Sequence, residues 1–379
     1  MKEGWEYKKL GEITTQISDG SHNPPKGIEY SNYPMLSSKN IFFDKFNYDS
    51  PRYLSKEDFE AENKRTNISD GDVLLTIVGT VGRTCCVQTP FTPFTLQRSV
   101  AVLKPQKDIV KARFLMYFLH SLSDFWEIEA KGVAQKGVYL KQVGKIPIPV
   151  PPLSEQQQIV EELDLLNGII EKKKAQLKEL DHLAQSLFYE MFGDPITNEK
   201  GWEVKKLKDV STLLNGRAYK QNELLSEGKY KVLRVGNFFT NSSYYYSDLE
   251  LEDNKYCDNG DLLFAWSASF GAFIWHGKKV IYHYHIWKVL FDEKVLNKIY
   301  YQYLLNTMTK SFMNDVHGIG MVHLTKVGME QYMLPVPPLA LQQQFASKIE
   351  AIEKQKELIK QSITEVETLF NSRMDYYFN

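Results

Sequence analysis

The chain is a tandem duplication, and this repeat constrains its fold more than any other feature of the sequence. Three motifs occur twice and in the same order, so the repeated unit dictates the architecture. The pairs are residues 4–10 (GWEYKKL) with 201–207 (GWEVKKL), 70–75 (DGDVLL) with 259–264 (NGDLLF), and 149–153 (PVPPL) with 335–339 (PVPPL).

The spacing between the two copies shrinks along the unit. It is 197 residues at the first motif, 189 at the second and 186 at the third, and 186 then holds to the C-terminus. The ends of the unit are therefore copied closely, whereas its middle has changed length. We interpret this as one repeated framework. The central segments of its two copies differ because each copy performs its own version of the same task.

Composition favours a soluble protein of two domains. The 379 residues exceed one ordinary core, and 43% hydrophobic and 25% charged residues are normal for a globular chain. The N-terminus lacks the apolar run of a signal peptide, and no stretch approaches the ~18 apolar residues of a membrane span. The three cysteines, Cys85, Cys86 and Cys257, form no C-x-x-C pair. We therefore expect a cytoplasmic protein that does not enter a membrane.

The net charge of −1 argues against a uniformly basic protein that binds nucleic acid over its whole surface. Positive charge can still be segregated on one face. Lys and Arg exceed Asp and Glu by 20 to 17 in residues 1–152 and by 17 to 16 in residues 193–337. Acidic residues exceed basic ones by 8 to 4 in residues 153–192 and by 6 to 5 in residues 338–379. The globular parts are thus faintly basic and the helical parts acidic.

The fold class predicted is α+β, with two mixed α/β domains separated by two long antiparallel coiled-coil helices in a pseudo-two-fold duplication. The Pro-rich motif should end each domain in an extended segment, since proline disfavours helix before it and suits the first turn after it. Strands are expected over 72–78, 99–103, 261–266 and 279–291, and helices over 109–130 and 294–316. The boundaries are 1–152 (first domain), 153–192 (first helix), 193–337 (second domain) and 338–379 (second helix).

A heptad pattern follows each Pro-rich motif and indicates coiled-coil helices. A helix packed only on its own domain is the alternative, but about forty residues span ~60 Å, which exceeds the face of a small domain. The polar interruptions of the two stripes do not coincide, so each helix can cover the other. The residues of this helix–helix seam are Ile159, Leu163, Leu166, Ile170, Leu177, Leu180, Phe345, Ile349, Ile352, Ile359, Ile363 and Val366.

Motifs for catalysis or metal binding are not evident. Residues 23–26 (NPPK) half-match the N-P-P-aromatic motif of adenine methyltransferases, but Lys26 replaces the aromatic that would stack on a flipped base. Residues 79–84 (GTVGRT) lack P-loop spacing. His283 and His285 share one strand face without an obvious third ligand, so no metal is expected. We expect no catalytic residue.

The duplicated order of these motifs resembles the specificity (S) subunits of type I restriction–modification systems over nearly the whole chain. The resemblance implies two target-recognition domains and two conserved helical regions, in a non-catalytic subunit that binds double-stranded DNA. It also implies two methyltransferase (M) subunits and restriction (R) subunits as partners. No cofactor is then expected in this chain, and S-adenosylmethionine, ATP and Mg belong to the partners.

This resemblance gives the long helices a further expected role. A pseudo-two-fold axis makes them antiparallel and places one recognition domain at each end. Such a rod suits an interrupted DNA site, because its length would set the distance between the two half-sites.

Candidate DNA-binding residues can be proposed only at positions that correspond between the copies. Residues 39–40 lie 197 before residues 236–237, and residues 97–98 correspond roughly to residues 285–286. Arg and Lys can pair with guanine edges and Asn and Gln with adenine, whereas a solvated charge or a loop-capping amide is the alternative for each. The candidates are Lys39, Asn40, Arg83, Gln97, Arg98, Lys136, Arg234, Asn237, His285 and His323.

Two other classes of function compete with DNA recognition. A coiled-coil scaffold that joins two protein-binding domains fits the near-neutral charge, but it gives no reason for similar joints around divergent middles. An enzyme with an unrecognised site is the third possibility, and the missing cofactor motifs weigh against it.

Overall fold

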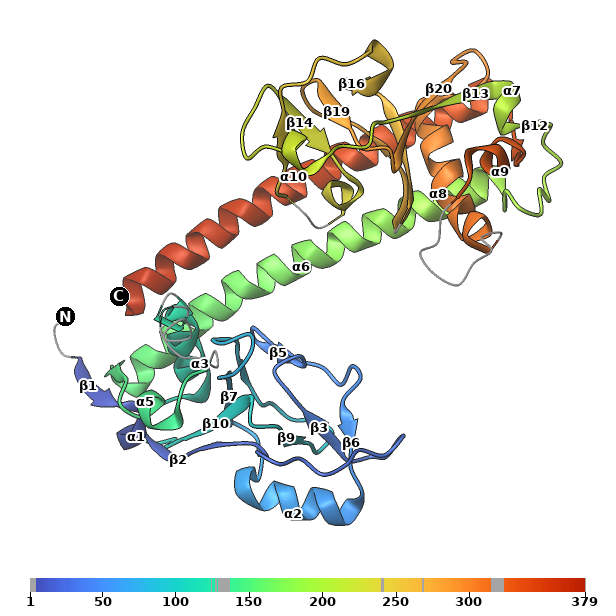
Figure 1. Cartoon of the computed structure of the whole chain (residues 1–379). Helices are drawn as coiled ribbons and strands as arrows, with labels where there is room; N and C mark the ends of the chain where they lie inside the picture. Colours follow the sequence, from blue (N-terminus) through green and yellow to red (C-terminus); the bar gives the residue numbers. More distant parts are fainter. Residues whose placement is uncertain are drawn as a thin grey trace. The chain divides into compact units, whose positions relative to one another are not determined.

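The computed structural model describes residues 5–123, 125–126, 128, 137–239, 242–267, 269–314 and 324–378. The chain forms two compact units, each with its own sheets and helices (Figure 1). Unit 1 comprises residues 1–174 and 361–379, and unit 2 comprises residues 175–360. Each unit therefore contains a part of both long helices.

A four-stranded antiparallel sheet of order β2-β10-β7-β8 forms the centre of unit 1. Helix α3 (Ala112–Ser121) packs on β7 and β8, and every side chain of these two strands is buried. A run of apolar residues therefore forms these strands, because they are covered rather than half exposed. The four strands are Thr14–Asp19 (β2), Val100–Pro105 (β10), Val73–Thr76 (β7) and Thr84–Cys86 (β8).

Smaller elements complete unit 1. Helix α2 (Lys56–Thr66) begins at Ser55, whose hydroxyl accepts a hydrogen bond from the Asp58 backbone N–H at 3.1 Å, and ends at Asn67 with φ 41°. The short helices are α1 (Leu10–Ile13) and α5 (Leu140–Val143). The strand groups are β1 (Glu6–Lys9) with β11 (Pro147–Val150), β6 (Arg52–Tyr53) with β3 (Pro34–Leu36) and β9 (Thr95–Leu96), and β4 (Ile41–Phe42) with β5 (Lys45–Phe46).

Unit 2 repeats this plan. Its central sheet has the order β13-β20-β17-β18, and α8 (Lys298–Asn314) packs on β18. The central strands are Ser211–Asn215 (β13), Ile286–Phe291 (β20), Leu262–Ser267 (β17) and Ser269–Ile274 (β18). The other strands are β12 (Val204–Lys206) with β21 (Met333–Pro335), and β15 (Tyr245–Ser247), β14 (Tyr230–Leu233), β19 (Val280–Tyr282) and β16 (Tyr256–Cys257) in a second sheet. The remaining helices are α7 (Leu207–Val210), α9 (Lys326–Glu330), η1 (Gln221–Glu223), η2 (Val235–Phe238) and η3 (Asp253–Lys255).

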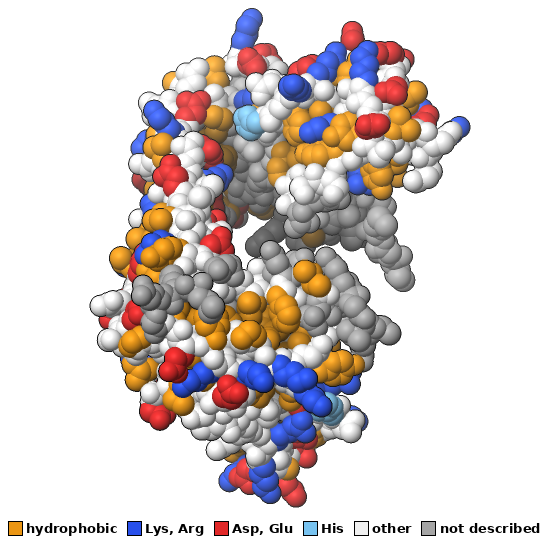
Figure 2. All heavy atoms as spheres, turned by 90° about the vertical axis from the view of Figure 1, so that its left-hand side faces the viewer, with side chains coloured by type: hydrophobic (Ala, Val, Ile, Leu, Met, Phe, Trp, Pro, Cys, Tyr) orange, Lys and Arg blue, Asp and Glu red, His pale blue; other side chains and the backbone are white. Residues whose placement is uncertain are grey.

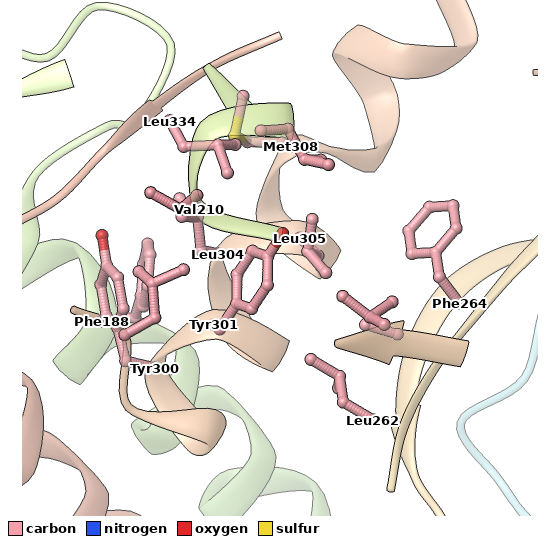
Figure 3. Packing of buried hydrophobic residues seen from close by; sticks show 14 of the residues in the cluster. Phe188, Val210, Leu262, Phe264, Tyr300, Tyr301, Leu304, Leu305, Met308 and Leu334 are labelled. Atoms are coloured by element: carbon pink, nitrogen blue, oxygen red, sulfur yellow. The ribbon is translucent and has the colours of Figure 1, made fainter. Parts of the chain in front are cut away.

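Aromatic and aliphatic side chains pack together in the core of unit 2 (Figure 3). The ring of Phe188 stacks on Tyr300, with 5.9 Å between centroids. The buried phenols find partners, because Tyr300 donates to the Pro335 carbonyl at 2.8 Å and the Tyr301 hydroxyl lies 2.7 Å from the Ser211 hydroxyl. Phe188 belongs to a long helix, so the end of that helix is part of this core.

Two helices of 40 residues each run from one unit into the other: α6 (Leu153–Phe192) and α10 (Leu339–Phe378). In unit 1, Arg373 near the end of α10 donates to Glu162 near the start of α6 at 2.9 Å. In unit 2, Lys356 of α10 pairs with Asp181 of α6 at 2.7 Å. The two helices therefore run antiparallel, as the sequence predicts.

The residues predicted for the seam between α6 and α10 differ in burial. Leu177, Leu180, Ile359 and Val366 are only half-buried, and an open apolar groove lies beside Leu180 and Ile359. The other eight seam residues are buried: Ile159, Leu163, Leu166, Ile170, Phe345, Ile349, Ile352 and Ile363.

The heptad assignment drifts at the C-terminal ends of the helices. Beyond Ala184 and Phe370, the buried residues there are Phe188 and Phe192 on α6, and Met374 and Phe378 on α10. These four leave the heptad. Each lies one position beyond the residue that a strict heptad would select. A straight helix turns every 3.6 residues rather than 3.5, so the buried face moves forward by about one residue over several heptads.

The glutamine that follows each Pro-rich motif explains why this segment is copied closely. Gln156 is fully buried: its carbonyl accepts from the Lys111 backbone N–H at 2.9 Å, and its amide donates to the Ile109 and Pro151 carbonyls at 2.9 and 2.8 Å. Gln342 is also fully buried and makes the equivalent bonds in unit 2. Each glutamine thus ties the start of a long helix to the segment before α3 or α8.

The Gly-Asp motif that recurs in both copies also has a local structural role. Gly71 and Gly260 have φ of 87° and 90°, a conformation that favours glycine. Asp72 pairs with Lys104, and Asp261 pairs with Lys288 at 2.6 Å. The lysine of the second copy lies two residues nearer the start of its strand, which keeps it on the same face because side chains alternate.

Three predicted elements differ from the structure. The strand expected over 279–291 is two strands, β19 and β20, with a turn at residues 283–285. The helices expected to begin at residues 109 and 294 begin at Ala112 and Lys298, because the preceding residues form the turn that the buried glutamines bind. Of the helices that the structure describes, none is long and apolar enough to cross a membrane.

Candidate nucleic-acid interface

One turn occurs at the same place in both units and carries different side chains. We call residues 97–99 (Gln-Arg-Ser) turn 1 and residues 283–285 (His-Tyr-His) turn 2. The Arg98 N–H donates to the Ser21 carbonyl at 2.9 Å, and the Tyr284 N–H donates to the Arg217 carbonyl at 3.1 Å. The first residue of each turn donates to Leu36 or Leu233, at 2.8 and 2.9 Å. The backbone framework is therefore the same in both copies.

The segment beneath each turn passes unusually close to it. A Cβ added at Gly20 would lie 2.0 Å from the Leu96 carbonyl oxygen, and one at Gly216 would lie 2.3 Å from that of Tyr282. Only glycine fits at these positions, because a Cβ would collide with backbone. This requirement is met in both copies, although the residues that follow the glycines, Ser21 and Arg217, differ.

These hydrogen bonds correct the correspondence proposed from sequence. Gln97 and Arg98 correspond to His283 and Tyr284, rather than to residues 285–286. The offset of 186 that holds at the Pro-rich motif therefore already applies at this turn. His285, named as a candidate, matches Ser99 and lies at the end of turn 2.

Turn 1 borders a cavity of about 410 Å³ whose wall is partly apolar and carries three basic side chains, Arg65, Arg98 and Lys141. Asp19 in this cavity is engaged, because Arg65 binds its carboxylate and His22 Nε2 lies 2.7 Å from Oδ2. Arg98 and Lys141 also line it, and neither makes an ion pair within the described part of the chain. Their charges are therefore available to an anionic ligand.

Turn 2 presents aromatic rings instead. The Tyr284 and His285 rings lie 4.0 Å apart, and Trp266 lies 5.2 Å from His285. Trp266 Nε1 donates to the Tyr284 carbonyl at 2.9 Å, which fixes the indole beside the turn. Tyr284 is exposed. This surface offers flat rings where turn 1 offers an amide and a guanidinium.

His283 of turn 2 is neutral at physiological pH. Burial lowers the pKa of its imidazole to about 4, with smaller contributions from His285 and Arg234. A neutral imidazole has one donor and one acceptor nitrogen. Within the described residues, no group of three His, Cys, Asp or Glu side chains is placed to hold a metal ion.

Asn40 and Asn237 correspond, as the sequence indicates, but both amides serve the local backbone. Asn40 is buried, accepts from the Ser37 N–H at 3.1 Å and donates to the Asp49 carbonyl at 3.0 Å. Asn237 accepts from the Arg234 N–H at 2.9 Å and donates to the Ser243 carbonyl at 2.9 Å. The loop-capping alternative describes both, and we leave them out of the proposed interface.

The candidate arginines outside the turns lie against aromatic rings. Arg83 lies 5.2 Å from the ring centre of Phe42 and donates to the Ile41 carbonyl at 3.3 Å. Arg234 lies 4.3 Å from the ring of Tyr245, and its Nε is buried without a hydrogen-bond partner in the described structure. Both guanidiniums are half-exposed and held in place.

Three candidates remain. Lys39 is exposed beside its capped turn. Lys136 and His323 lie outside the described residues. Sequence reasoning missed His22, Arg65, Lys141 and Trp266, which come from distant segments that only the fold brings to the turns. It also missed Tyr284, which lies within turn 2 next to the named His285. Figure 2 shows Lys and Arg side chains gathered in a band on unit 1, beside a histidine.

The two units thus repeat one backbone framework and present different side chains on a matched turn. Residues 2–181 and 199–368 each match the type I restriction modification DNA specificity domain. The chain therefore belongs to the family of type I restriction–modification specificity subunits.

Relatives and solved structures agree with this assignment. The chain is 26% identical over 387 residues to the type I restriction enzyme MjaIX specificity subunit of Methanocaldococcus jannaschii, covering 92% of this chain and 86% of that one. It is 25% identical to the EcoKI specificity subunit of Escherichia coli, over 70% of this chain and 61% of that one. Its fold is similar to that of the type I restriction-modification S subunit from M. genitalium, with a TM-score of 0.56 at 13% identity, covering 99% of this chain and 96% of that one. A chain from a study of type I R-M complex assembly gives 0.59 at 18% identity, with 100% and 98% covered.

Proposed function

We propose that this chain is the DNA-recognition subunit of a type I restriction–modification complex. Unit 1 and unit 2 each recognise one half of a bipartite site in double-stranded DNA, and the chain itself is non-catalytic. Two M subunits transfer methyl groups from S-adenosylmethionine, and R subunits use ATP and Mg to cleave. We place this activity in the cytoplasm, where the three buried cysteines stay reduced.

One observation carries this proposal: turns 1 and 2 share a backbone framework and differ at every side chain. A turn with a purely structural role could carry the same residues in both copies. Two recognition surfaces that read different sequences need the same position and different donors, acceptors and rings. We therefore assign both turns, with Arg98 and Tyr284 most exposed, to base or groove contacts.

The M subunits are the proposed partners of the long helices. Both long helices contain more Asp and Glu than Lys and Arg, which disfavours phosphate contact and makes protein the better ligand. Exposed Leu358 and the half-buried Leu180 and Ile359 line an apolar groove in the part of these helices that belongs to unit 2.

The test combines binding and methylation. Purified chain with its M subunit should shift a duplex that contains the methylated site and should shift unrelated duplex more weakly. Loss of methylation at one bipartite motif should follow deletion of the gene in the host. The isolated chain should neither bind S-adenosylmethionine nor methylate DNA. Assembly with M but no preference among duplexes would instead favour the scaffold alternative.

A further inference from the structure

A cavity of about 720 Å³ lies in unit 2, between α8, β18 and the first part of α10. Phe273, Ile299 and Tyr303 form an apolar and aromatic part of its wall. A polar part comes from neutral side chains and His276. Glu350 and Glu353 of α10 line it as well. The cavity therefore combines a surface for an apolar side chain with negative charge.

The same place in unit 1 is filled by an arginine. At the constant offset of 186, Arg113 corresponds to Ile299, Tyr117 to Tyr303 and Asp164 to Glu350. Arg113 Nε lies 2.9 Å from both carboxylate oxygens of Asp164, and its Nη2 lies 2.6 Å from Oδ1. Tyr117 also donates to Asp164, at 2.6 Å. The copied helices thus form a guanidinium site in unit 1.

The hairpin of β4 and β5 completes that site. Asp44 accepts from Nη1 and Nη2 of Arg113 at 2.8 and 2.9 Å, opposite Asp164. Its neighbour Phe43 lies 6.0 Å from the Tyr117 ring and stacks on His120 at 3.8 Å. An arginine beside an aromatic ring therefore occupies this position in unit 1.

Among the described residues, unit 2 keeps one of the two carboxylates and the phenol and lacks the arginine. Ile299 stands where Arg113 would be, and Tyr303 and Glu350 remain. Glu353 pairs with Lys356 at 2.7 Å, whereas Glu350 makes no ion pair within the described residues. A carboxylate beside a phenol and an apolar wall is the arrangement that binds a planar guanidinium well.

We propose that this cavity receives an arginine side chain, with an adjacent aromatic or aliphatic residue, from a protein partner. Unit 1 supplies the chemical precedent, since its own Arg113 and Phe43 occupy the equivalent space. The carboxylates exclude a DNA backbone. The identity of the partner as the M subunit rests on the proposed function, whereas the guanidinium site itself does not.

The first experiment tests the cavity alone. Full-length protein with labelled isoleucine methyl groups is titrated with acetyl-Phe-Arg-amide, and acetyl-Phe-citrulline-amide serves as the uncharged control. The arginine peptide should move the Ile299 and Ile349 methyl signals at millimolar concentration, and Glu350→Gln should remove the response. Unchanged signals, or an equal response to the citrulline peptide, would overturn the guanidinium site.

The second experiment tests the partner. Ile299→Arg gives unit 2 the arginine that unit 1 already has, so the chain should stay folded with its cavity filled from within. Its affinity for the M subunit should fall about tenfold or more, whereas Ile299→Met should bind nearly as the parent does. A folded Ile299→Arg protein with unchanged affinity overturns the partner assignment. A parent chain that does not bind M at all contradicts the proposed function, and the peptide titration still decides the cavity.

Discussion

Gln156 and Gln342 show how one polar side chain can keep a sequence motif unchanged. Each is fully buried and satisfies three backbone groups at the joint between a domain and a long helix. The neighbouring Gln158 is exposed. The run of three glutamines therefore contains one structural residue, and the sequence alone does not show which.

We predict that Gln156→Ala lowers the free energy of unfolding by about 2–4 kcal/mol, because buried donors and acceptors lose their partners. Gln158→Ala should change it by less than about 0.5 kcal/mol. Chemical denaturation of both variants measures the difference. Equal stability of the two would mean that water or a side-chain shift replaces the Gln156 bonds.

His120 should make unit 1 sensitive to acid. Burial lowers the pKa of its imidazole to about 4 from an ordinary 6.5, so the unfolded chain binds the proton more readily. The stabilisation is complete above pH 6.5 and is lost as the pH falls towards 4, by up to about 3 kcal/mol. Denaturation at several pH values checks this.

The repeat supplies the control for that measurement. Asn306 stands at the matching position of unit 2, so His120→Asn is a substitution that the framework already accepts. The variant should lose part of the pH dependence between 6.5 and 4. His283, whose pKa is also lowered to about 4, should account for part of the remainder. An unchanged pH profile in His120→Asn would contradict the assignment.

At the scale of elements, turns 1 and 2 should be exchangeable. We predict that Gln97→His, Arg98→Tyr and Ser99→His together change the half-site recognised by unit 1, because the backbone accepts either set of side chains. Each altered base preference should amount to about 1–3 kcal/mol. Methylation sequencing of a host that expresses the variant with M and R provides the readout.

The unit 2 half-site should stay the same in that experiment. Lys64→Ala, at an exposed position of α2, is the matched control and should preserve both half-sites. A folded turn 1 variant that methylates the original sequence at full rate would show that the turn does not contact bases.

The elements themselves could be predicted where periodicity decides them. The central strands and both long helices have strong apolar patterns, and the structure confirms them. The turn within 279–291 could not be seen, because His283-Tyr284-His285 continues an aromatic run that is typical of strands. The burial of Phe188 and Phe378 was missed because a heptad ignores the drift of a straight helix.

The candidate site was harder to predict for a different physical reason. Asn40 and Asn237 were correctly matched to each other, but an asparagine that caps a turn and one that binds adenine look alike in sequence. His22, Arg65 and Lys141 meet beside Arg98 only after folding. Proximity of this kind depends on the sheet order, which no single segment encodes.

At the scale of the whole molecule, the constant offset of 186 residues makes α6 and α10 equal in length. We predict that deleting residues 170–176 together with 356–362 shortens the unread spacer of the DNA site. Seven residues at ~1.5 Å each remove about 10 Å, or about three base pairs at ~3.4 Å per pair. Both half-sites should stay the same, and the heptad phase is retained.

Methylation sequencing distinguishes the outcomes of that deletion. Weaker binding is compatible with the prediction, because the half-sites also rotate by nearly a third of a turn. A folded, active variant that methylates the original site with its original spacer would contradict it. The helices would then hold partners without measuring the DNA.

Residues 361–379 complete a unit whose other part is synthesised before unit 2. Residues 361–379 belong to unit 1, where Phe378 lies 5.3 Å from the ring of Phe114 and Phe370 lies 6.1 Å from Tyr117. At about 5–20 residues per second, the ribosome needs roughly 10–40 s to make the intervening unit 2. Unit 1 must therefore leave the ribosome with an uncovered aromatic face, and a prematurely terminated chain keeps that face exposed to chaperones and proteases.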